Sequence, residues 1–476
     1  MDLLELTIKD TIEALKNKTF SCLELTKETF SNIKKNDKKI NAFLTLNEEN
    51  ALKQAKEYDD LIKEDAQIFD RKPLLGVPVA VKDLFTTEGI RTTAGSKIIG
   101  DYIPPFNSTV IKKLLAAGAI ITGKTNQDAW GHGSSGENTD YEPTKNPYDL
   151  TRVPGGSSSG SGAAVAYGAS LVGTGTDTGS SVRLPAGFCN LVGLKPTYGR
   201  VSRYGIIAMA SSFDTIGHMT KTVYDNAKVL EVTAGVDPYD STTVPEKVGS
   251  YTKVLGQSIK GLKIGLPKEY FVEGLDKKID ESIRNSLKVF EKLGATIQEI
   301  SLPYTEYAMA AYYILVPSEV SSNLSRFDGV RYGNVREFFG AEAKRRIMLG
   351  SYTLSSGYYD AYYLKAAKVR TLIKQDFEKA FEKVDVIIAP TSPTLPFKIG
   401  EKTDDPLAMY LSDIFLCPVN LAGIPGLSIQ SGFVDGLPVG MQLMGSQFSE
   451  ELLYKTAYLF EKETEYYKIH PKFKNG

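Results

Sequence analysis

Short apolar runs alternate with amphipathic stretches along most of this chain, and this alternation is the feature that most constrains its fold. Runs of strand length occupy residues 74–81, 119–121, 170–173, 262–266, 296–300, 384–389 and 438–444. Segments with helical character lie between or after them, at 108–117, 277–293 and 450–460. Strands that alternate with helices are typical of α/β proteins. We therefore predict an α/β fold with a mixed or parallel β-sheet.

The first 66 residues have a different pattern, because they are helical and rich in lysine. They contain three amphipathic runs, each preceded by a residue that can cap a helix: Thr7 before 8–16, Ser21 before 23–33, and Asn47 before 50–62. We predict that this part forms an outer helical layer on the α/β core. Two later segments, Tyr304–Tyr313 and 333–344, are predicted to be excursions from that core.

The overall composition narrows the possible partners and compartments. The net charge is −1, so the whole protein has no strong electrostatic attraction to nucleic acid or to an anionic membrane. The three cysteines, Cys22, Cys189 and Cys417, are far apart and form no CxxC pair, which supports neither a zinc site nor a disulfide framework. Apolar runs are too short to span a membrane, and the N-terminus has no signal-peptide pattern. We expect a cytoplasmic protein.

Two segments rich in glycine and serine, Pro154–Ala164 and Gly173–Arg183, are the strongest indication of function. A flexible linker or a phosphate-binding loop would have a similar composition. The linker is disfavoured because both segments lie inside the alternation of strands and helices. The phosphate loop is disfavoured because neither the GK[ST] ending nor the GxGxxG spacing is present. Successive backbone N–H groups in such a turn can instead bind a developing oxyanion.

These two segments, together with Val79–Asp83, resemble the amidase signature family, and the match continues through Cys189–Thr197. The resemblance covers nearly the whole chain. It implies a single large amidase-signature domain over residues 1–476, whose mixed β-sheet is covered by helices on both faces. Four stretches resemble in particular the glutamine-hydrolysing subunits of tRNA-dependent amidotransferases: Lys195–Gly205, Ser321–Gly333, Lys344–Tyr363 and Asp413–Gly426.

The resemblance implies a Ser–Ser–Lys triad in which Ser181 is the nucleophile, Ser157 is the bridging serine and Lys82 is the base. It also implies a cis peptide bond before Ser157. The oxyanion hole is expected to consist of the backbone N–H groups of Thr178, Gly179, Ser180 and Ser181. A lysine is a plausible base here, because it follows an apolar run and burial favours the neutral amine that can accept a proton.

The substrate that the resemblance implies is glutamine, which has an ammonium and a carboxylate beside its reactive amide. Asp413 is expected to bind the ammonium and Arg346 the carboxylate, while Tyr312 lines the pocket. A bidentate arginine suits a carboxylate well. Arg345 is a rival to Arg346, because the segment before these arginines is shorter than the family pattern.

The implied reaction releases ammonia for a partner subunit, which amidates Glu-tRNA(Gln), Asp-tRNA(Asn) or both. The expected partners are a tRNA-binding kinase/transamidase subunit together with a small linker subunit. The tRNA is expected to be contacted mainly through the former. No cofactor is expected in this chain, whereas ATP and Mg²⁺ are expected at the partner.

Several positions depart from the family pattern. Ser159 and Ser180 stand where glycine is common, and Ser180 would be strained if its backbone had a positive φ. The segment Gln127–His132 replaces the more usual Met-Asp-Glu-Phe-Ala-Met, which alters one wall of the expected pocket.

Three other functions are compatible with parts of the pattern. A stand-alone amidase for small, aryl or fatty amides would have the same triad. An inactive scaffold protein is disfavoured because all three triad residues are present. A Ser-His-Asp hydrolase would need His132 or His218, which we interpret as a polar wall residue and a structural histidine.

Overall fold

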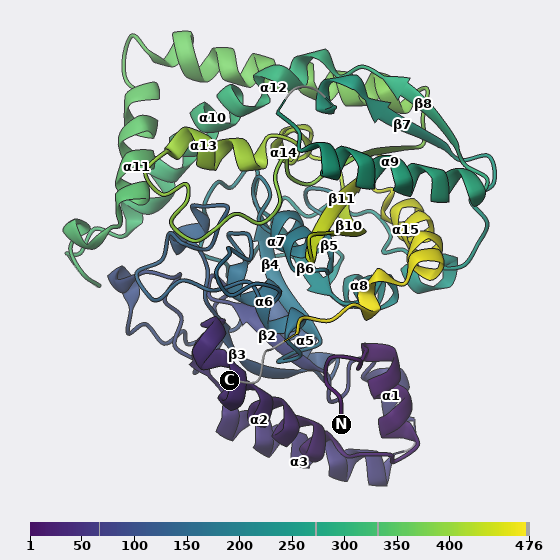
Figure 1. Ribbon diagram of the computed structural model, residues 1–476. Coiled ribbons are helices and arrows are strands. Elements are labelled where there is room, and N and C mark those ends of the chain that lie inside the picture. The colour runs from purple at the N-terminus through teal and green to yellow at the C-terminus, as the bar shows by residue number, and fades with distance from the viewer. Residues whose placement is uncertain (66, 272–273, 331–332, 473–476) are drawn as a thin grey trace.

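A mixed sheet of eleven strands runs through the computed structural model, which describes residues 1–65, 67–271, 274–330 and 333–472 (Figure 1). In their order across the sheet, the strands are β1 (Phe43–Leu46), β3 (Ile120–Thr125), β2 (Pro78–Lys82), β4 (Val172–Asp177), β6 (Thr215–Thr220), β5 (Val192–Lys195), β10 (Gly426–Val434), β11 (Leu437–Met444), β9 (Val386–Pro390), β7 (Lys263–Pro267) and β8 (Thr296–Ile300). Strand β2 is parallel to β3 and β4, and β7 is parallel to β8 and β9. The other pairs are antiparallel, so the predicted mixed sheet is confirmed.

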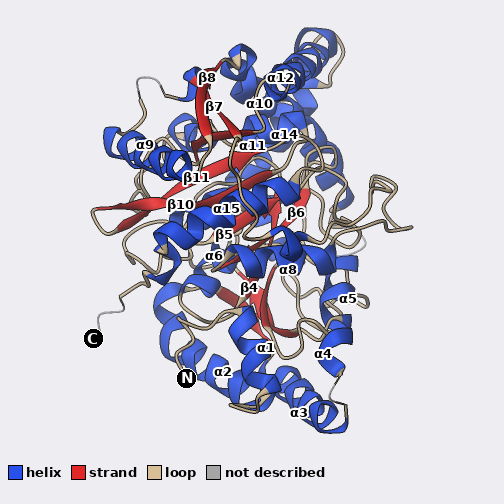
Figure 2. Cartoon of the chain, turned by 90° about the vertical axis from the view of Figure 1, so that its right-hand side faces the viewer, coloured by secondary structure: helices blue, strands red, loops and turns tan. Residues whose placement is uncertain are grey.

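Helices cover both faces of this sheet (Figure 2). They are α1 (Ile8–Lys16), α2 (Cys22–Ile40), α3 (Glu48–Glu64), α4 (Ile68–Arg71), α5 (Thr109–Ala116), α6 (Ser159–Ala166), α7 (Arg183–Phe188), α8 (Val223–Thr233), α9 (Lys277–Lys292), α10 (Ala308–Asn323), α11 (Ala341–Thr353), α12 (Lys365–Phe381), α13 (Pro406–Tyr410), α14 (Cys417–Ala422) and α15 (Glu450–Thr464). In β9, Val386 and Ile388 pack with α8, α9 and α15, whereas Ile387 and Ala389 pack with α10 and α12. Successive strand residues point to opposite faces, so each face has its own apolar core.

The N-terminal helices α1, α2 and α3 form a layer at one end of the molecule (Figure 1). Thr7 and Ser21 cap α1 and α2 as predicted, and Ser21 forms a full capping box. Helix α3 begins directly after Asn47, although the side chain of this residue makes no capping hydrogen bond. The layer packs against the central strands through Ala80 of β2 and Ile120 of β3.

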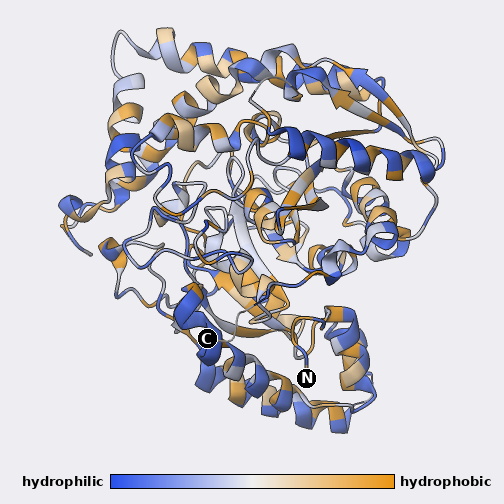
Figure 3. Ribbon diagram, in the orientation of Figure 1, coloured by the Kyte–Doolittle hydropathy of each residue, from blue (hydrophilic) through white to orange (hydrophobic). Residues whose placement is uncertain are grey.

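Helix α6 lies at the centre of the molecule, and all eight of its residues are buried. Figure 3 shows orange ribbon at this helix, whereas the outer helices α2 and α9 are largely blue. Because α6 begins at Ser159, it anchors the first glycine- and serine-rich segment inside the core. The segment is therefore no flexible linker.

Two sequence-based expectations about the fold are wrong. Tyr304–Tyr313 is no excursion from the core, since α10 begins at Ala308 and buries Tyr312. The second predicted excursion, 333–344, runs into α11, where Ala343 is buried. In both segments tyrosines, charges or glycines obscure the helical spacing of small apolar residues. Strands β1, β5, β6 and β10 had no clear sequence signal, because they are short or contain glycine and polar residues.

Among the described residues, no helix combines the length and the apolar character needed to cross a membrane. Residue 66, at the end of the predicted helical layer, lies outside the described residues. The same is true of Arg331 and Tyr332 within the stretch Ser321–Gly333.

Candidate active site

Lys82 is the last residue of β2, between β3 and β4 at the centre of the sheet. Its Nζ atom donates hydrogen bonds to Ser157 Oγ at 2.7 Å and to Thr176 Oγ1 at 2.9 Å. The backbone N–H of Lys82 donates to Thr174 Oγ1 at 3.0 Å. Thr174 and Thr176 are two residues apart on β4 and therefore face the same side. The neighbouring strand thus fixes both ends of the lysine.

The environment of Lys82 favours an amine that can accept a proton. Burial lowers the pKa of Lys82 to about 7, although the nearby carboxylates of Asp128, Asp177 and Asp214 favour its charged form. Burial also raises the pKa of Asp128 to about 7. Near neutral pH, Lys82 therefore exchanges a proton far more readily than an exposed lysine.

The segment that contains Ser157 is held in place by the residues around Asp128. The Gly156–Ser157 peptide bond is cis. The N–H of Gly156 donates to the Ser134 carbonyl at 2.7 Å, and the Ser157 carbonyl accepts from Asp128 N–H at 3.2 Å. A Cβ atom at Gly156 would collide with the Asp128 carboxylate. Position 156 therefore requires glycine.

A buried ion pair shapes the turn that contains Ser181. Arg183 donates from Nε and Nη2 to the two carboxylate oxygens of Asp177, each at 3.0 Å. Burial opposes the charge on Asp177, but Arg183 and its other partners lower the pKa of this carboxyl below its usual value. Asn420 of α14 donates to Asp177 Oδ1 at 3.0 Å. Two helices, α7 and α14, thus hold the turn through the same carboxylate.

The two glycine- and serine-rich segments meet at their serines. Ser158 N–H donates to the Ser181 carbonyl at 3.2 Å, so the backbone links the segments of Ser157 and Ser181. Ser181 is 5% exposed, which leaves it access to a ligand. Neither Ser159 nor Ser180 is among the described residues with a positive φ, so serine is tolerated at both positions.

The expected oxyanion hole lies between Asp214 and Tyr312. Thr178 Oγ1 donates to Asp214 Oδ1 at 2.7 Å, and burial raises the pKa of Asp214 to about 6. A Cβ atom at Gly179 would lie 2.6 Å from the Tyr312 hydroxyl, so this tyrosine covers the turn. In the described part of the chain, no backbone carbonyl accepts from the N–H groups of Thr178, Gly179 or Ser180. These groups are available to bind an anion.

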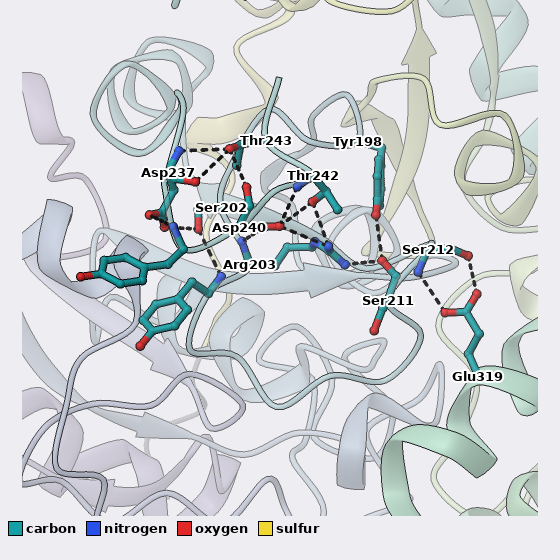
Figure 4. A network of polar contacts seen from close by, with 12 residues as sticks. Tyr198, Ser202, Arg203, Ser211, Ser212, Asp237, Asp240, Thr242, Thr243 and Glu319 are labelled. Atoms are coloured by element: carbon teal, nitrogen blue, oxygen red, sulfur yellow. Dashed lines mark hydrogen bonds and ion pairs between the residues drawn. The ribbon is translucent and has the colours of Figure 1, made fainter. Parts of the chain in front are cut away.

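The loop that leads to Asp214 is fixed at the surface by a polar network (Figure 4). Arg203 donates to the Ser211 carbonyl and forms an ion pair with Asp240 at 3.5 Å. Ser212 N–H donates to Glu319 Oε2 of α10 at 2.9 Å. Because Asp214 is only two residues further along the chain, this network sets the position of its carboxylate beside Thr178.

A cavity of about 220 Å³ opens next to this site. It is lined by residues from three regions of the chain: Asp128, His132, Gly133, Ser134, Ser135, Glu137 and Asn138; Tyr313, Ala341, Glu342, Arg345 and Arg346; and Lys402, Thr403, Pro406, Met409 and Tyr410. Tyr313, rather than the predicted Tyr312, contributes directly to this lining. Its ring stacks on Tyr410 with a centroid distance of 3.9 Å.

The structure distinguishes between the two candidate arginines. The side chain of Arg346 is 4% exposed, whereas that of Arg345 is 41% exposed. Arg346 Nε donates to Glu342 Oε1 at 2.7 Å, and its Nη1 has no partner among the described residues. Arg346 therefore has a free donor in a buried setting, while Arg345 lies at the rim.

Asp413 lies in the short 3₁₀ helix Leu411–Asp413 and is buried. Burial raises its pKa to about 7, while a hydrogen bond from Ser180 and the charge of Arg346 act in the opposite direction. Within the described residues its Oδ1 atom has no hydrogen-bond partner. A free carboxylate oxygen thus lies between the oxyanion turn and the buried arginine.

Sequence analysis missed Thr176, Asp128 and Glu342 as parts of this site. Thr176 had a usable signal, since it shares a face of β4 with Thr174. The histidines offer no alternative triad in the described part of the chain, where none hydrogen-bonds to Ser181. His218 instead contacts Thr233 Oγ1 at 2.9 Å, and burial lowers its pKa to about 3.

Known proteins resemble this chain over almost its entire length. The family described as Amidase matches residues 24–454. The A subunit of glutamyl-tRNA(Gln) amidotransferase from Carboxydothermus hydrogenoformans is 54% identical over 99% of this chain and 100% of its own length. Its counterpart from Oceanobacillus iheyensis is 51% identical over 99% of both chains.

Solved structures give the same result. The corresponding protein from Thermotoga maritima covers 97% of this chain and 95% of its own, with 40% identity and a TM-score of 0.83. A bacterial aryl acylamidase of the amidase signature family covers 98% of both chains, with 26% identity and a TM-score of 0.86. The buried lysine beside the serine of a cis peptide, the fold and these similarities agree: the chain belongs to the amidase signature family.

Proposed function

We propose that this chain is the glutamine-hydrolysing component of a glutamyl-tRNA(Gln) amidotransferase. Relatives that share 51–54% of their residues over 99% of the chain are A subunits of this enzyme. The observation that most directly supports the chemistry is the 2.7 Å contact between Lys82 Nζ and Ser157 Oγ in a fully buried setting. A lysine with a lowered pKa beside a serine hydroxyl is an arrangement that activates a nucleophile.

In the proposed reaction, Ser181 Oγ attacks the carboxamide carbon of glutamine. The hydroxyl proton passes through Ser157 to Lys82, and the N–H groups of Thr178, Gly179 and Ser180 stabilise the oxyanion. The intermediate collapses when the proton returns to the leaving nitrogen, which departs as ammonia. Water then hydrolyses the ester on Ser181 and releases glutamate, again with Lys82 and Ser157 as the proton path.

The amino-acid end of glutamine is proposed to bind between Asp413 and Arg346. The free Oδ1 atom of Asp413 suits the ammonium, and the free Nη1 atom of Arg346 suits the carboxylate. Tyr312 closes the side of the oxyanion turn. Glu342 keeps Arg346 charged and oriented, since it accepts from Nε and also from the Tyr410 hydroxyl at 3.0 Å.

The ammonia is proposed to serve another protein of the same assembly, because the relatives are named as one lettered component of an amidotransferase. That partner would be the tRNA-binding kinase/transamidase subunit, which supplies the site for ATP and Mg²⁺. A small linker subunit would complete the complex. This chain then needs no cofactor of its own, because Lys82, Ser157 and Ser181 perform the hydrolysis.

The test is to co-express the chain with the two partner proteins of a related complex and to measure ammonia release and amidation of Glu-tRNA(Gln). The complex should hydrolyse glutamine and form Gln-tRNA(Gln), while its Ser181→Ala variant should need free ammonium for the second step. A stand-alone amidase would instead hydrolyse uncharged amides as well as glutamine. It would also fail to support tRNA amidation.

A further inference from the structure

His132 is a fully buried histidine in the wall of the cavity beside Arg346. Both of its ring nitrogens lack a hydrogen-bond partner among the described residues. An unpaired buried polar group costs about 1–3 kcal/mol, so a side chain with two such atoms points to a ligand that satisfies them. No residue of the proposed triad or oxyanion hole uses this histidine.

The backbone of His132 is firmly placed. Its N–H donates to the Ala129 carbonyl at 3.0 Å, and its own carbonyl accepts from Asn138 Nδ2 at 2.6 Å. The preceding Gly131 has a positive φ, and a Cβ atom there would lie 3.7 Å from Ser157 Oγ. His132 is therefore held next to the reacting centre by a turn whose geometry is fixed.

The ring of His132 is neutral in this setting. Burial and the nearby charge of Arg346 both keep its pKa well below the ordinary value. A neutral imidazole has one N–H donor and one acceptor nitrogen. Because Arg346 has only donors, a carboxylate between the two residues would receive hydrogen bonds from both.

We propose that His132 is a further specificity-determining residue, which donates a ring N–H to the α-carboxylate of glutamine beside Arg346. The inference rests on the proposed glutaminase function. Three observations support it together: the two unpartnered ring nitrogens, the unpartnered Nη1 atom of Arg346, and the position of both residues on one cavity. Asp413 remains the partner of the ammonium at the other end of the amino-acid group.

The experiment uses three substrates that differ by one charged group each. Glutamine has both charges, glutaramate has the carboxylate without the ammonium, and 4-aminobutanamide has the ammonium without the carboxylate. The variants are His132→Met, which removes the hydrogen-bonding atoms at similar length, and His132→Gln, which retains an N–H donor. Steady-state ammonia release is measured with the assembled complex, and the melting temperature reports on folding.

For His132→Met, KM for glutamine and for glutaramate should rise about tenfold, the loss expected for one hydrogen bond to a charged group. Both kcat and KM for 4-aminobutanamide should remain unchanged. His132→Gln should restore most of the affinity for the two carboxylate substrates. A merely structural histidine would not produce this dependence on the carboxylate.

Equal losses on all three substrates, or no loss on any, would overturn the role of His132. If His132→Met does not fold, His132→Gln must still discriminate glutaramate from 4-aminobutanamide as the unaltered complex does. Failure of the proposed function is a separate outcome: the unaltered complex would then show no preference for glutamine over butanamide, which lacks both charges.

Discussion

Lys82 Nζ lies 2.7 Å from Ser157 Oγ, and both residues are almost completely removed from solvent. This contact joins the end of a central strand to the glycine- and serine-rich segment before α6. Burial lowers the pKa of the lysine to about 7, so the contact links two groups that can exchange a proton near neutral pH. The predictions below follow from this contact and from the groups around it.

Removal of any triad member should abolish most of the glutaminase activity. Ser181→Ala removes the nucleophile, and Lys82→Ala or Ser157→Ala should each lower kcat by roughly 10²- to 10⁴-fold, the contribution of a positioned general base. Ammonia release is the measurement, and an unchanged melting temperature serves as the folding control for the two serine variants. Near-normal turnover by Lys82→Ala would mean that another group is the base.

Activity should depend on the protonation of Lys82. The base must be neutral to accept a proton, so kcat/KM for an uncharged amide should rise with pH through about 7 and fall below it. The Asp128 charge favours the protonated lysine, so Asp128→Asn should move the midpoint to lower pH. A midpoint that stays in place or moves to higher pH would contradict this electrostatic account.

The charged pocket should select glutamine through its two ends. Arg346→Met and Asp413→Asn should each raise KM for glutamine about tenfold or more, because each removes a charged hydrogen-bonding group. KM for an uncharged amide should change little. Arg345→Met is the matched control, since this neighbouring side chain is 41% exposed. Comparable effects of the Arg345 and Arg346 substitutions would reject the assignment.

The ion pair between Arg183 and Asp177 should contribute strongly to stability, because both side chains are fully buried. Arg183→Met leaves the carboxylate without its counter-ion and should lower the free energy of unfolding by about 3–5 kcal/mol. Arg284→Met breaks the exposed pair with Asp280 and should cost less than about 1 kcal/mol. Chemical denaturation measures both, and equal small losses would show that the Asp177 turn is held by its other partners.

Much of this molecule could be predicted from local sequence patterns. The caps Thr7 and Ser21 and the helix at 277–292 were predictable, because capping and amphipathic spacing act over a few residues. Strands β5 and β6 were not, since their burial is imposed by the strands on either side rather than by their own composition. Helix α10 was obscured by tyrosines for the same reason: its burial comes from packing.

The candidate site shows the same division. The two serine segments and Lys82 could be identified as one set from their resemblance to a family. The choice between Arg345 and Arg346 could not, because it depends on which side of α11 faces the cavity. The roles of Glu342 and His132 depend on three-dimensional neighbours far away in the sequence.

The most direct test of the central claim is to identify the acylated residue. The assembled complex is mixed with glutamine, quenched in acid and digested, and the peptides are analysed by mass spectrometry. A γ-glutamyl group on Ser181, absent from the Ser181→Ala variant, is the predicted result. A γ-glutamyl group on Ser157 or on any other residue, or ammonia release without an acylated peptide, would contradict the proposed mechanism.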